Sequence, residues 1–447
     1  GQVFAHTSEF DPLTSENFIG FAHAAYADGQ KATVKTTGSI ARNIPQIASA
    51  SNTLGSKVIF ESGSTALISQ TFDSNSNRVV IAYADADDSN KGKAVVGSID
   101  PSDNSITYGT AVEFNSGTTA MVACSFDSDS NKVVIAYADG GNSNYGTAKV
   151  GTVDSSDNSI SFGSATVYES ASINDSGPQS ITFDSNSNKI VIAYRDVGNS
   201  NYGTAIVGTV SGTSISFGTA VVYESARAIG PAAIFDSSNN KIVIAYRDLG
   251  NSDYGTAIVG TVSGTGISFG TAVVFETAEA NEIGATFDSS NNKVVIAYSD
   301  EGVNGQGTAI VGTVSGTSIS FGTAVVFDSD NSNMPSLTFD TNANKVVIAY
   351  QDRGTDGSDQ GTVITGSVSG TSITFDTATE FDDSDVNSIG CTFDSNSKRV
   401  SIAYADQGNS TYGTGIIVTP AGTPEDLTIG QQYFVQTDGT LGTSADS

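Results

Sequence analysis

Short apolar runs alternate with polar turns along most of the chain, and the pattern repeats. The apolar runs are rich in Val, Ile, Phe and Tyr, which favour β-strands, and Asp, Asn, Gly and Ser between them favour turns. Helical periodicity is absent from these segments. One repeat of this kind contains four predicted strands, at residues 232–235, 242–246, 256–262 and 267–275.

A recurring phrase, Phe-Asp-Ser-x-x-Asn-Lys-Val-Val-Ile-Ala-Tyr-x-Asp, marks the repeats. It occurs seven times with small variations, and its first residue is Phe72, Phe126, Phe183, Phe235, Phe287, Phe339 or Phe393. The spacing is 52 to 57 residues, a period that is typical of propellers and solenoids. Four strands in each of seven repeats predict an all-β fold, a seven-bladed β-propeller with four-stranded blades.

The seventh repeat lacks its fourth strand, and a matching segment lies ahead of the first repeat. Residues 54–62 resemble the end of a fourth strand elsewhere in the chain, residues 269–277. We therefore predict that this N-terminal strand closes the last blade, which leaves no unpaired sheet edge there. An open array of β-modules, the alternative, would not need a displaced strand of the matching type.

The two ends of the chain do not match the repeat, although they contain strand-like runs and hairpin turns. Closure of the ring would bring residues 51 and 420 together. The predicted organisation is therefore a small β-domain in two halves, 1–50 and 421–447, with the propeller, 51–420, inserted between them. The chain begins with Gly1 rather than Met, from which we expect a processed chain or a piece of a longer one.

These ends carry a resemblance to a known family. Residues 13–20 read Leu-Thr-Ser-Glu-Asn-Phe-Ile-Gly, residues 38–41 read Gly-Ser-Ile-Ala, and residues 427–441 read Leu-Thr-Ile-Gly-Gln-Gln-Tyr-Phe-Val-Gln-Thr-Asp-Gly-Thr-Leu. This combination resembles a small β-module of virion structural and tail-fibre proteins of marine, chiefly cyanobacterial, bacteriophages, and the repeat phrase is similar to repeats in such proteins. The resemblance implies a tail-fibre or decoration protein on the virion surface, outside the cell. Its expected partners are other virion proteins, through the flanking β-domain, and a host surface glycan or receptor.

Charge excludes some other partners. The chain has 48 acidic and 19 basic residues, a net charge of −29, whereas a nucleic-acid backbone or an anionic membrane surface attracts a basic protein. No stretch approaches the roughly 18 apolar residues of a membrane span, so we predict no membrane insertion. A homo-oligomer is compatible with the sequence.

Comparison of the repeats with each other indicates a ligand surface. The turns after the motif Phe are nearly constant, whereas the segments before it differ, as in 226–231, 278–283 and 330–335. The residue after the motif Tyr differs as well. We interpret these positions as loops on one face that were diversified for binding; drift in exposed loops is the alternative.

Six residues of this variable face are the candidate ligand contacts. Arginine suits bidentate contact with carboxylates or sulfates, which suggests an anionic glycan, and the alternative is pairing with local acids at 196, 248 and 352. A tyrosine ring can stack on a sugar or pack against a strand. The candidates are Arg195, Arg227, Arg247, Arg353, Tyr202 and Tyr254.

The sequence singles out no catalytic residue. One Asp follows each motif Tyr two positions later, and seven equivalent copies indicate a structural role in capping the next turn. A glycosidase needs two specific carboxylates instead. We therefore predict a non-enzymatic protein; a purely structural spacer and a glycan-cleaving enzyme are the alternatives.

The sequence indicates no cofactor. The Asp-rich turns at 85–90 and 382–385 support at most weak calcium binding, because they lack the Gly and terminal Glu of a dedicated calcium loop. The two cysteines, Cys124 and Cys391, fall in repeats that another repeat separates, too far apart for a disulfide. We predict free, buried thiols.

Overall fold

A computed structural model describes most of the repeat region and short parts of both ends. Contacts within the chain divide it into two compact units, Asn52–Pro420 and the two ends, Gly1–Ser51 with Ala421–Ser447. The described part has no helix long and apolar enough to cross a membrane. The described residues are 2–4, 21–22, 34–35, 51–173, 177–354, 359–422, 432–435 and 441–442.

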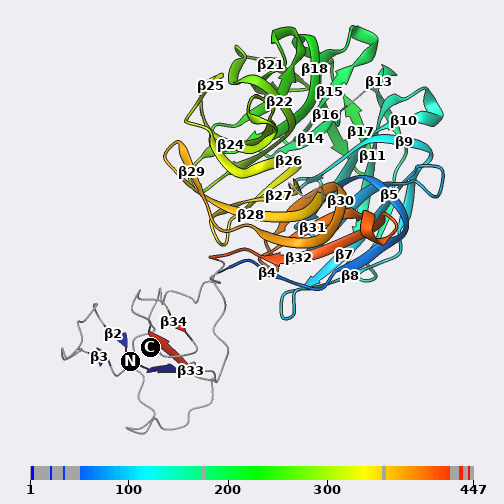
Figure 1. Cartoon of the computed structure of the whole chain (residues 1–447). Coiled ribbons are helices and arrows are strands. Elements are labelled where there is room, and N and C mark those ends of the chain that lie inside the picture. The colour runs from blue at the N-terminus through cyan, green and yellow to red at the C-terminus, as the bar shows by residue number, and fades with distance from the viewer. Residues whose placement is uncertain are drawn as a thin grey trace. The chain divides into compact units, whose positions relative to one another are not determined.

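Long strands that belong to two neighbouring sheets form the framework of Asn52–Pro420 (Figure 1). We call them crossing strands. They are β5 (Val58–Asp73), β9 (Val112–Asp127), β13 (Thr166–Ser172) with β14 (Ser180–Asp184), β18 (Val221–Asp236), β22 (Val273–Asp288), β26 (Val325–Asp340) and β30 (Thr379–Asp394).

Each crossing strand is followed by three shorter strands, except β30, which is followed by two. The first of these carries the Val-Val-Ile-Ala-Tyr run: β6 (Arg78–Asp85), β10 (Lys132–Asp139), β15 (Lys189–Asp196), β19 (Lys241–Asp248), β23 (Lys293–Asp300), β27 (Lys345–Arg353) and β31 (Arg399–Asp406). The second comprises β7 (Lys91–Asp100), β11 (Tyr145–Asp154), β16 (Tyr202–Ser211), β20 (Tyr254–Ser263), β24 (Gln306–Ser315), β28 (Asp359–Ser369) and β32 (Tyr412–Thr419). The third is short: β8 (Ser105–Tyr108), β12 (Ser159–Phe162), β17 (Ser214–Phe217), β21 (Gly266–Phe269), β25 (Ser318–Phe321) and β29 (Ser372–Phe375).

All strands of one repeat sheet pair antiparallel. In the sheet around β19, the second half of β18 pairs with β19, β19 pairs with β20, and β20 pairs with both β21 and the first half of β22. A crossing strand is thus the inner edge of one sheet and part of the outer edge of the sheet before it. This dual membership links every sheet to its neighbour.

The N-terminal strand closes the ring, as predicted. After β32 the chain supplies no further strand for this sheet, and the start of the repeat region takes the outer place. Val418 of β32 pairs with Leu54 in β4 (Thr53–Leu54), and Thr414 pairs with Ile59 in β5. The strands of Asn52–Pro420 therefore pair in a closed cycle.

The fourth predicted strand of each repeat is not one strand. The run 267–275 is divided between β21 and β22, with a break at Gly270. A Cβ atom at Gly270 would lie 1.9 Å from the carbonyl oxygen of Thr317, in a turn of the next repeat. The chain therefore bends where the neighbouring backbone approaches, and glycine is required for that approach.

The hydrophobic core lies between neighbouring sheets. Along β15, Ile190, Ile192 and Tyr194 belong to one core cluster, and Val191 and Ala193 belong to the next. All five side chains are fully buried. This explains why the motif is a continuous apolar run, because a strand that is covered on both faces has no polar side.

A buried tyrosine connects each sheet to the one before it. Tyr246 of β19 is fully buried, and its ring lies edge-on to that of Tyr223, with centroids 5.1 Å apart. Its hydroxyl donates to the carboxylate of Glu224 on β18, 3.0 Å away. The same hydrogen bond recurs in other repeats, as Tyr83–Glu61, Tyr194–Glu169 and Tyr298–Glu276.

The described strands at the two ends of the chain form two further small sheets. β33 (Gln432–Val435) pairs with β1 (Gln2–Phe4) and with β34 (Leu441–Gly442), and β2 (Phe21–Ala22) pairs with β3 (Val34–Lys35). The two ends of the sequence therefore share one sheet. The residues that carry the resemblance lie largely outside the described residues.

Removal of the Tyr246 hydroxyl should destabilise the fold. Tyr246→Phe leaves the packing in place but deprives the Glu224 carboxylate of a donor, and hydrogen bonds to charged groups contribute about 1.5–3 kcal/mol. We expect the free energy of unfolding to fall by about that amount, measured by chemical denaturation.

Tyr137→Phe is the matched control. Tyr137 occupies the same place in its repeat, but Asn115 stands where the others have Glu or Asp, and no described residue hydrogen-bonds to its hydroxyl. Loss of the Tyr137 hydroxyl should lower the free energy of unfolding by less than half as much as loss of the Tyr246 hydroxyl. Equal effects of the two variants would contradict a contribution from the carboxylate.

Candidate functional site

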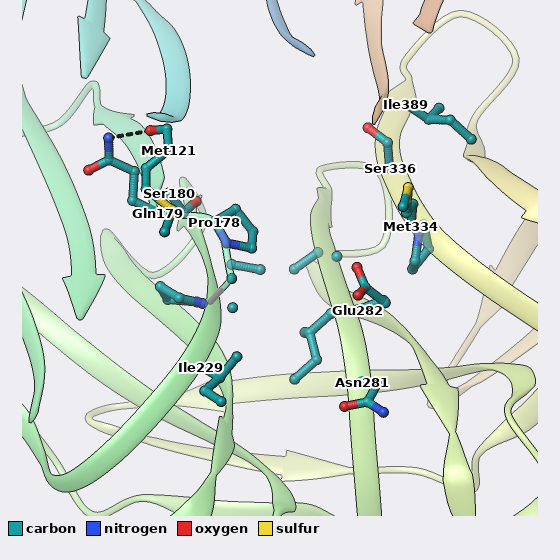
Figure 2. A pocket seen from close by; sticks show the side chains of 18 of the residues that line it. Met121, Pro178, Gln179, Ser180, Ile229, Asn281, Glu282, Met334, Ser336 and Ile389 are labelled. Carbon is teal, nitrogen blue, oxygen red and sulfur yellow. Dashed lines mark hydrogen bonds between the residues drawn. The ribbon is translucent and has the colours of Figure 1, made fainter. Parts of the chain in front are cut away.

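The crossing strands line a central cavity of about 770 Å³ (Figure 2). Residues from β5, β9, β18, β22, β26 and β30, together with residues 177–180, line it, and β19 contributes Arg247. The volume is within the range of small-molecule sites, about 300–1,000 Å³. The fold therefore brings one short segment of every repeat to a single concave surface.

The lining segments are the ones that vary between repeats, but they are not loops. Residues 226–231 and 278–283 lie inside the continuous strands β18 and β22. Each strand contains a β-bulge at this place. The pairing of β18 with β19 skips from Ile229 to Ala232, and that of β22 with β23 skips from Asn281 to Gly284. The expectation of loops was wrong, because these segments are where one strand passes from one sheet to the next.

In six of the seven repeats the bulge holds one residue in the left-handed backbone region. This residue lies five positions before the motif Phe, and its φ is between 49° and 56°. Glycine and asparagine adopt this region readily, whereas other residues do so at a cost of about 1–2 kcal/mol. The described residues in this conformation are Leu67, Met121, Gly230, Glu282, Met334 and Ser388.

The cavity wall is mainly apolar. Both methionines of the chain, Met121 and Met334, lie on it, with isoleucine, leucine, alanine and proline side chains between them. Gln179 anchors one part of the wall by donating from its side-chain nitrogen to the carbonyl oxygen of Met121 at 2.5 Å (Figure 2). No aromatic ring is present among the described lining residues.

Glu282 is the one carboxylate among the described residues that line the cavity. Its side chain is exposed to the cavity (Figure 2), and no described residue forms a hydrogen bond or an ion pair with it. The surrounding protein removes much of its hydration, which raises the pKa of the carboxyl, and the positive charge of Arg353 acts in the opposite direction.

Arg247 is the one cation among those lining residues, and its charge is matched. Its Nε lies 2.9 Å from the carboxylate of Asp253, and its Nη2 lies 2.8 Å from that of Glu279. It also donates to the side-chain oxygen of Asn281. Local acids do pair with this arginine, although they are not the neighbouring Asp248. An anionic glycan would have to compete with two carboxylates for it.

The other predicted contacts do not reach the cavity. Arg195 is 6% exposed, on β15. Arg353 is more exposed and lies 3.3 Å from the carboxylate of Asp359. Tyr202 is half-buried, in register with Arg227 on the adjacent strand, and Tyr254 is half-buried as well. The structure brings only Arg247, of the six candidates, to the cavity wall.

Sequence reasoning missed Glu282 and the two methionines. A signal was present, because the chain has only two methionines and both lie five residues before a motif Phe. Aligning the repeats on that position gives Leu, Met, Pro, Gly, Glu, Met and Ser. These residues occupy the same position in every repeat but differ in size and polarity, so the alignment could have identified them as one variable ring.

Three carboxylates gather away from the cavity wall. Oxygens of Asp328, Asp330 and Asp352 lie within 4.8 Å of one another, and the backbone nitrogen of Asp330 donates to Asp328 at 3.0 Å. Carboxylate oxygens are ligands that Ca²⁺ accepts. These residues differ from the turns in which the sequence suggested weak calcium binding.

Two structural predictions are confirmed. The Asp after the motif Tyr caps the next turn: Asp139 accepts from the amide of Gly141 at 3.0 Å, and Asp248 accepts from that of Gly250 at 2.9 Å. Cys124 and Cys391 are free and buried. Burial raises the pKa of both thiols to about 12, so neither is a reactive thiolate near neutral pH.

Comparison with known proteins shows the fold. No protein-family model matches the sequence, and curated proteins give no match. Among solved structures, a lectin, BP39L from Burkholderia pseudomallei, is similar with a TM-score of 0.57 and 11% identity, over 83% of this chain and 100% of the lectin. A chain of a mitotic checkpoint complex is similar with a TM-score of 0.52 and 10% identity, over 85% of this chain and 98% of that one. The periplasmic gluconolactonase PpgL from Pseudomonas aeruginosa has a TM-score of 0.51 and 12% identity, over 71% of this chain and 86% of the gluconolactonase.

At these identities the likeness concerns the fold alone. The chain has an all-β, propeller-like architecture, shared by a binding protein and by a protein named for an enzymatic activity. Function must therefore be argued from the site.

The Asp328 cluster should make stability depend on pH. Desolvation, with a smaller effect from Asp352 and Asp330, raises the pKa of Asp328 from 3.8 to about 6. Between these two values the folded protein keeps a proton that the unfolded chain has released, so stability falls as pH rises from about 4 to 6. We therefore expect Asp328→Asn to be more stable than the natural chain at pH 7. The gain should be only about 1 kcal/mol, because solvent screens the partly exposed carboxylate.

The difference between Asp328→Asn and the natural chain should shrink as the pH falls from 6 to 4, because folded Asp328 stays protonated while a growing fraction of the unfolded chains regains the proton. Denaturant unfolding at pH 4, 5, 6 and 7 measures it. Asp129→Asn, which removes a charge from an exposed turn, controls for net charge. A difference that is the same at all four values would contradict the raised pKa.

Proposed function

We propose that Asn52–Pro420 is a seven-bladed β-propeller and a non-enzymatic binding module on a virion surface. Its ligand site is the central cavity, and its ligand belongs to the surface of the host cell, as a receptor or a glycan. The two ends of the chain attach it to other virion proteins, and the protein is located on the virion surface, outside the cell. The attachment and the location rest on the resemblance of these ends to phage virion proteins.

The residues kept in strained backbone at the cavity carry the binding proposal. Every described bulge has a left-handed residue, for which Gly or Asn would cost least. The chain uses Gly230 once, but it has Leu67, Met121, Glu282 and Met334 at the matching positions. Strain that is tolerated at a concave surface favours a functional use of these side chains.

The composition of the wall favours binding over hydrolysis. A glycosidase of the usual kind needs two carboxylates about 5–10 Å apart, and the described lining residues include only Glu282. The Asp328, Asp330 and Asp352 cluster is not part of the cavity wall. A glycan-cleaving enzyme therefore has less support than a binding module.

The same wall alters the expectation about the ligand. The anionic glycan was inferred from arginines, of which Arg195 is buried and Arg247 is paired. Sugar rings commonly stack on aromatic side chains, and the described lining has none. A ligand with apolar character fits the cavity better than a sugar ring alone.

Replacing apolar lining residues should abolish cell attachment without unfolding the protein. Leu67→Asn with Met334→Asn removes two apolar side chains, and Asn tolerates the left-handed backbone. The matched control, Val167→Asn with Val326→Asn, changes two residues that are 42% and 47% exposed on β13 and β26. We expect at least a tenfold loss of attachment to marine cyanobacterial cells for the first pair and little loss for the second, measured with labelled protein.

The alternatives predict different results. Equal attachment by both double variants would contradict the cavity as the site. No attachment to any strain would favour the structural spacer, and release of soluble sugar from the cell surface would favour the enzyme.

A further inference from the structure

The cavity offers one charge, that of Glu282, which has no hydrogen-bond or ion-pair partner among the described residues. Glu282 lies on the wall with its carboxylate exposed to the cavity, whereas Arg247, the cation on the same wall, is held by Asp253 and Glu279. Arg353, whose charge acts on Glu282, lies against Asp359. A carboxylate on a mainly apolar wall attracts an opposite charge more strongly than one in open water does. A ligand that complements this wall therefore carries a cation.

There is room beside this carboxylate for such a partner. Around the ring of bulges, the position before Glu282 is Gly230, which has no side chain, and the position after it is Met334. Among the described atoms, a Cβ atom at Gly230 would meet none closer than Pro178 Cδ, 4.0 Å away. The absence of a side chain at Gly230 thus leaves open space next to the one carboxylate of the described wall.

The surroundings decide which kind of cation fits. A metal ion such as Ca²⁺ requires six to eight oxygen ligands, and the neighbours of Glu282 on the wall are mainly apolar. A quaternary ammonium is usually held by aromatic rings, which the described wall lacks. A primary ammonium can donate hydrogen bonds to the carboxylate, and Ile229, Ile283 and Met334 provide apolar contact for the stem that carries it.

We propose that the central cavity binds a primary ammonium group on an apolar stem, with Glu282 as its counterion and the space above Gly230 as the seat of the ammonium. The premise that the cavity is a ligand site rests on the proposed function. The charge and the apolar stem are the new elements. Desolvation of Glu282 accords with the proposal, since a partly dehydrated carboxylate gains more from a cation than a hydrated one does.

Three probes with the same stem test the charge preference: n-hexylammonium, n-hexanol and hexanoate. Isothermal titration at pH 7 on the full chain should give a dissociation constant for hexylammonium at least tenfold lower than for hexanol. Hexanoate should bind more weakly than both, because Glu282 repels it. Hexyltrimethylammonium should bind more weakly than hexylammonium, because it has no hydrogen to donate.

Two variants assign the preference to its residues. Glu282→Gln should make hexylammonium and hexanol bind alike, since the amide is neutral and of similar size. Gly230→Asn, which keeps the left-handed backbone, should weaken hexylammonium at least tenfold by filling the space beside the carboxylate. Glu380→Gln is the control, because it removes one carboxylate from an exposed position on the outer part of β30.

The proposal is overturned if hexylammonium does not bind, if hexanol binds as tightly, or if Glu282→Gln leaves the difference between them intact. These outcomes are separate from those of cell attachment. If the variants at Leu67 and Met334 abolish attachment while Glu282→Gln changes nothing, the cavity is a site for another ligand. If hexylammonium binds as expected but no cell is bound, the ammonium site stands and the surface-attachment function fails.

Discussion

The membership of each crossing strand in two sheets is the constraint on which the rest of this structure depends. A strand such as β18 completes the outer edge of one repeat sheet and then forms the inner edge of the next. The two sheets face each other across a buried core, so the strand must change sheet without leaving its hydrogen bonds unmade. Bulges on either side of the crossing solve this, because they turn the strand and leave only a few residues without a ladder partner. The closing pairing of β32 with β4 and β5 applies the same device where the chain begins.

The same constraint creates the cavity wall. The bulges occur at the same place in six of the repeats, and their unpaired residues gather with residues 177–180 around one central space. Scaffold and site are thus separable in the sequence. The Val-Val-Ile-Ala-Tyr runs determine how the sheets pack, and the short segment before each motif Phe determines what the cavity presents. Substitution in that segment changes few core contacts, which is why repeats with nearly constant strands can differ so widely there.

Much of the fold could be predicted from the sequence, because its physical causes are local and repeated. Continuous apolar runs predicted strands buried on both faces, and the displaced segment at 54–62 predicted the closure. The break at Gly270 could not be read from the run itself, since its cause is the backbone of Thr317 in the next repeat. The site was placed less well for a similar reason. Segments of mixed polarity such as 226–231 look like loops in sequence, and only the pairing with the next strand makes them extended. Arg195 was assigned to the variable face because the residue after the motif Tyr differs between repeats, yet it is only 6% exposed.

The differences among the bulge residues around the cavity also limit the kind of ligand. Identical residues at each bulge would make a symmetric wall, suited to a ligand on the ring axis. The wall here has a carboxylate at Glu282, a gap at Gly230 and a thioether at Met334 in consecutive repeats, while Leu67, Met121 and Ser388 belong to the remaining part. The polar attraction and the free space are therefore both on one side, and a bound molecule gains most by lying off the axis. A repeated scaffold with one distinct side can recognise an asymmetric molecule, because the repeats supply the shape of the cavity and the few exceptions among them supply the orientation.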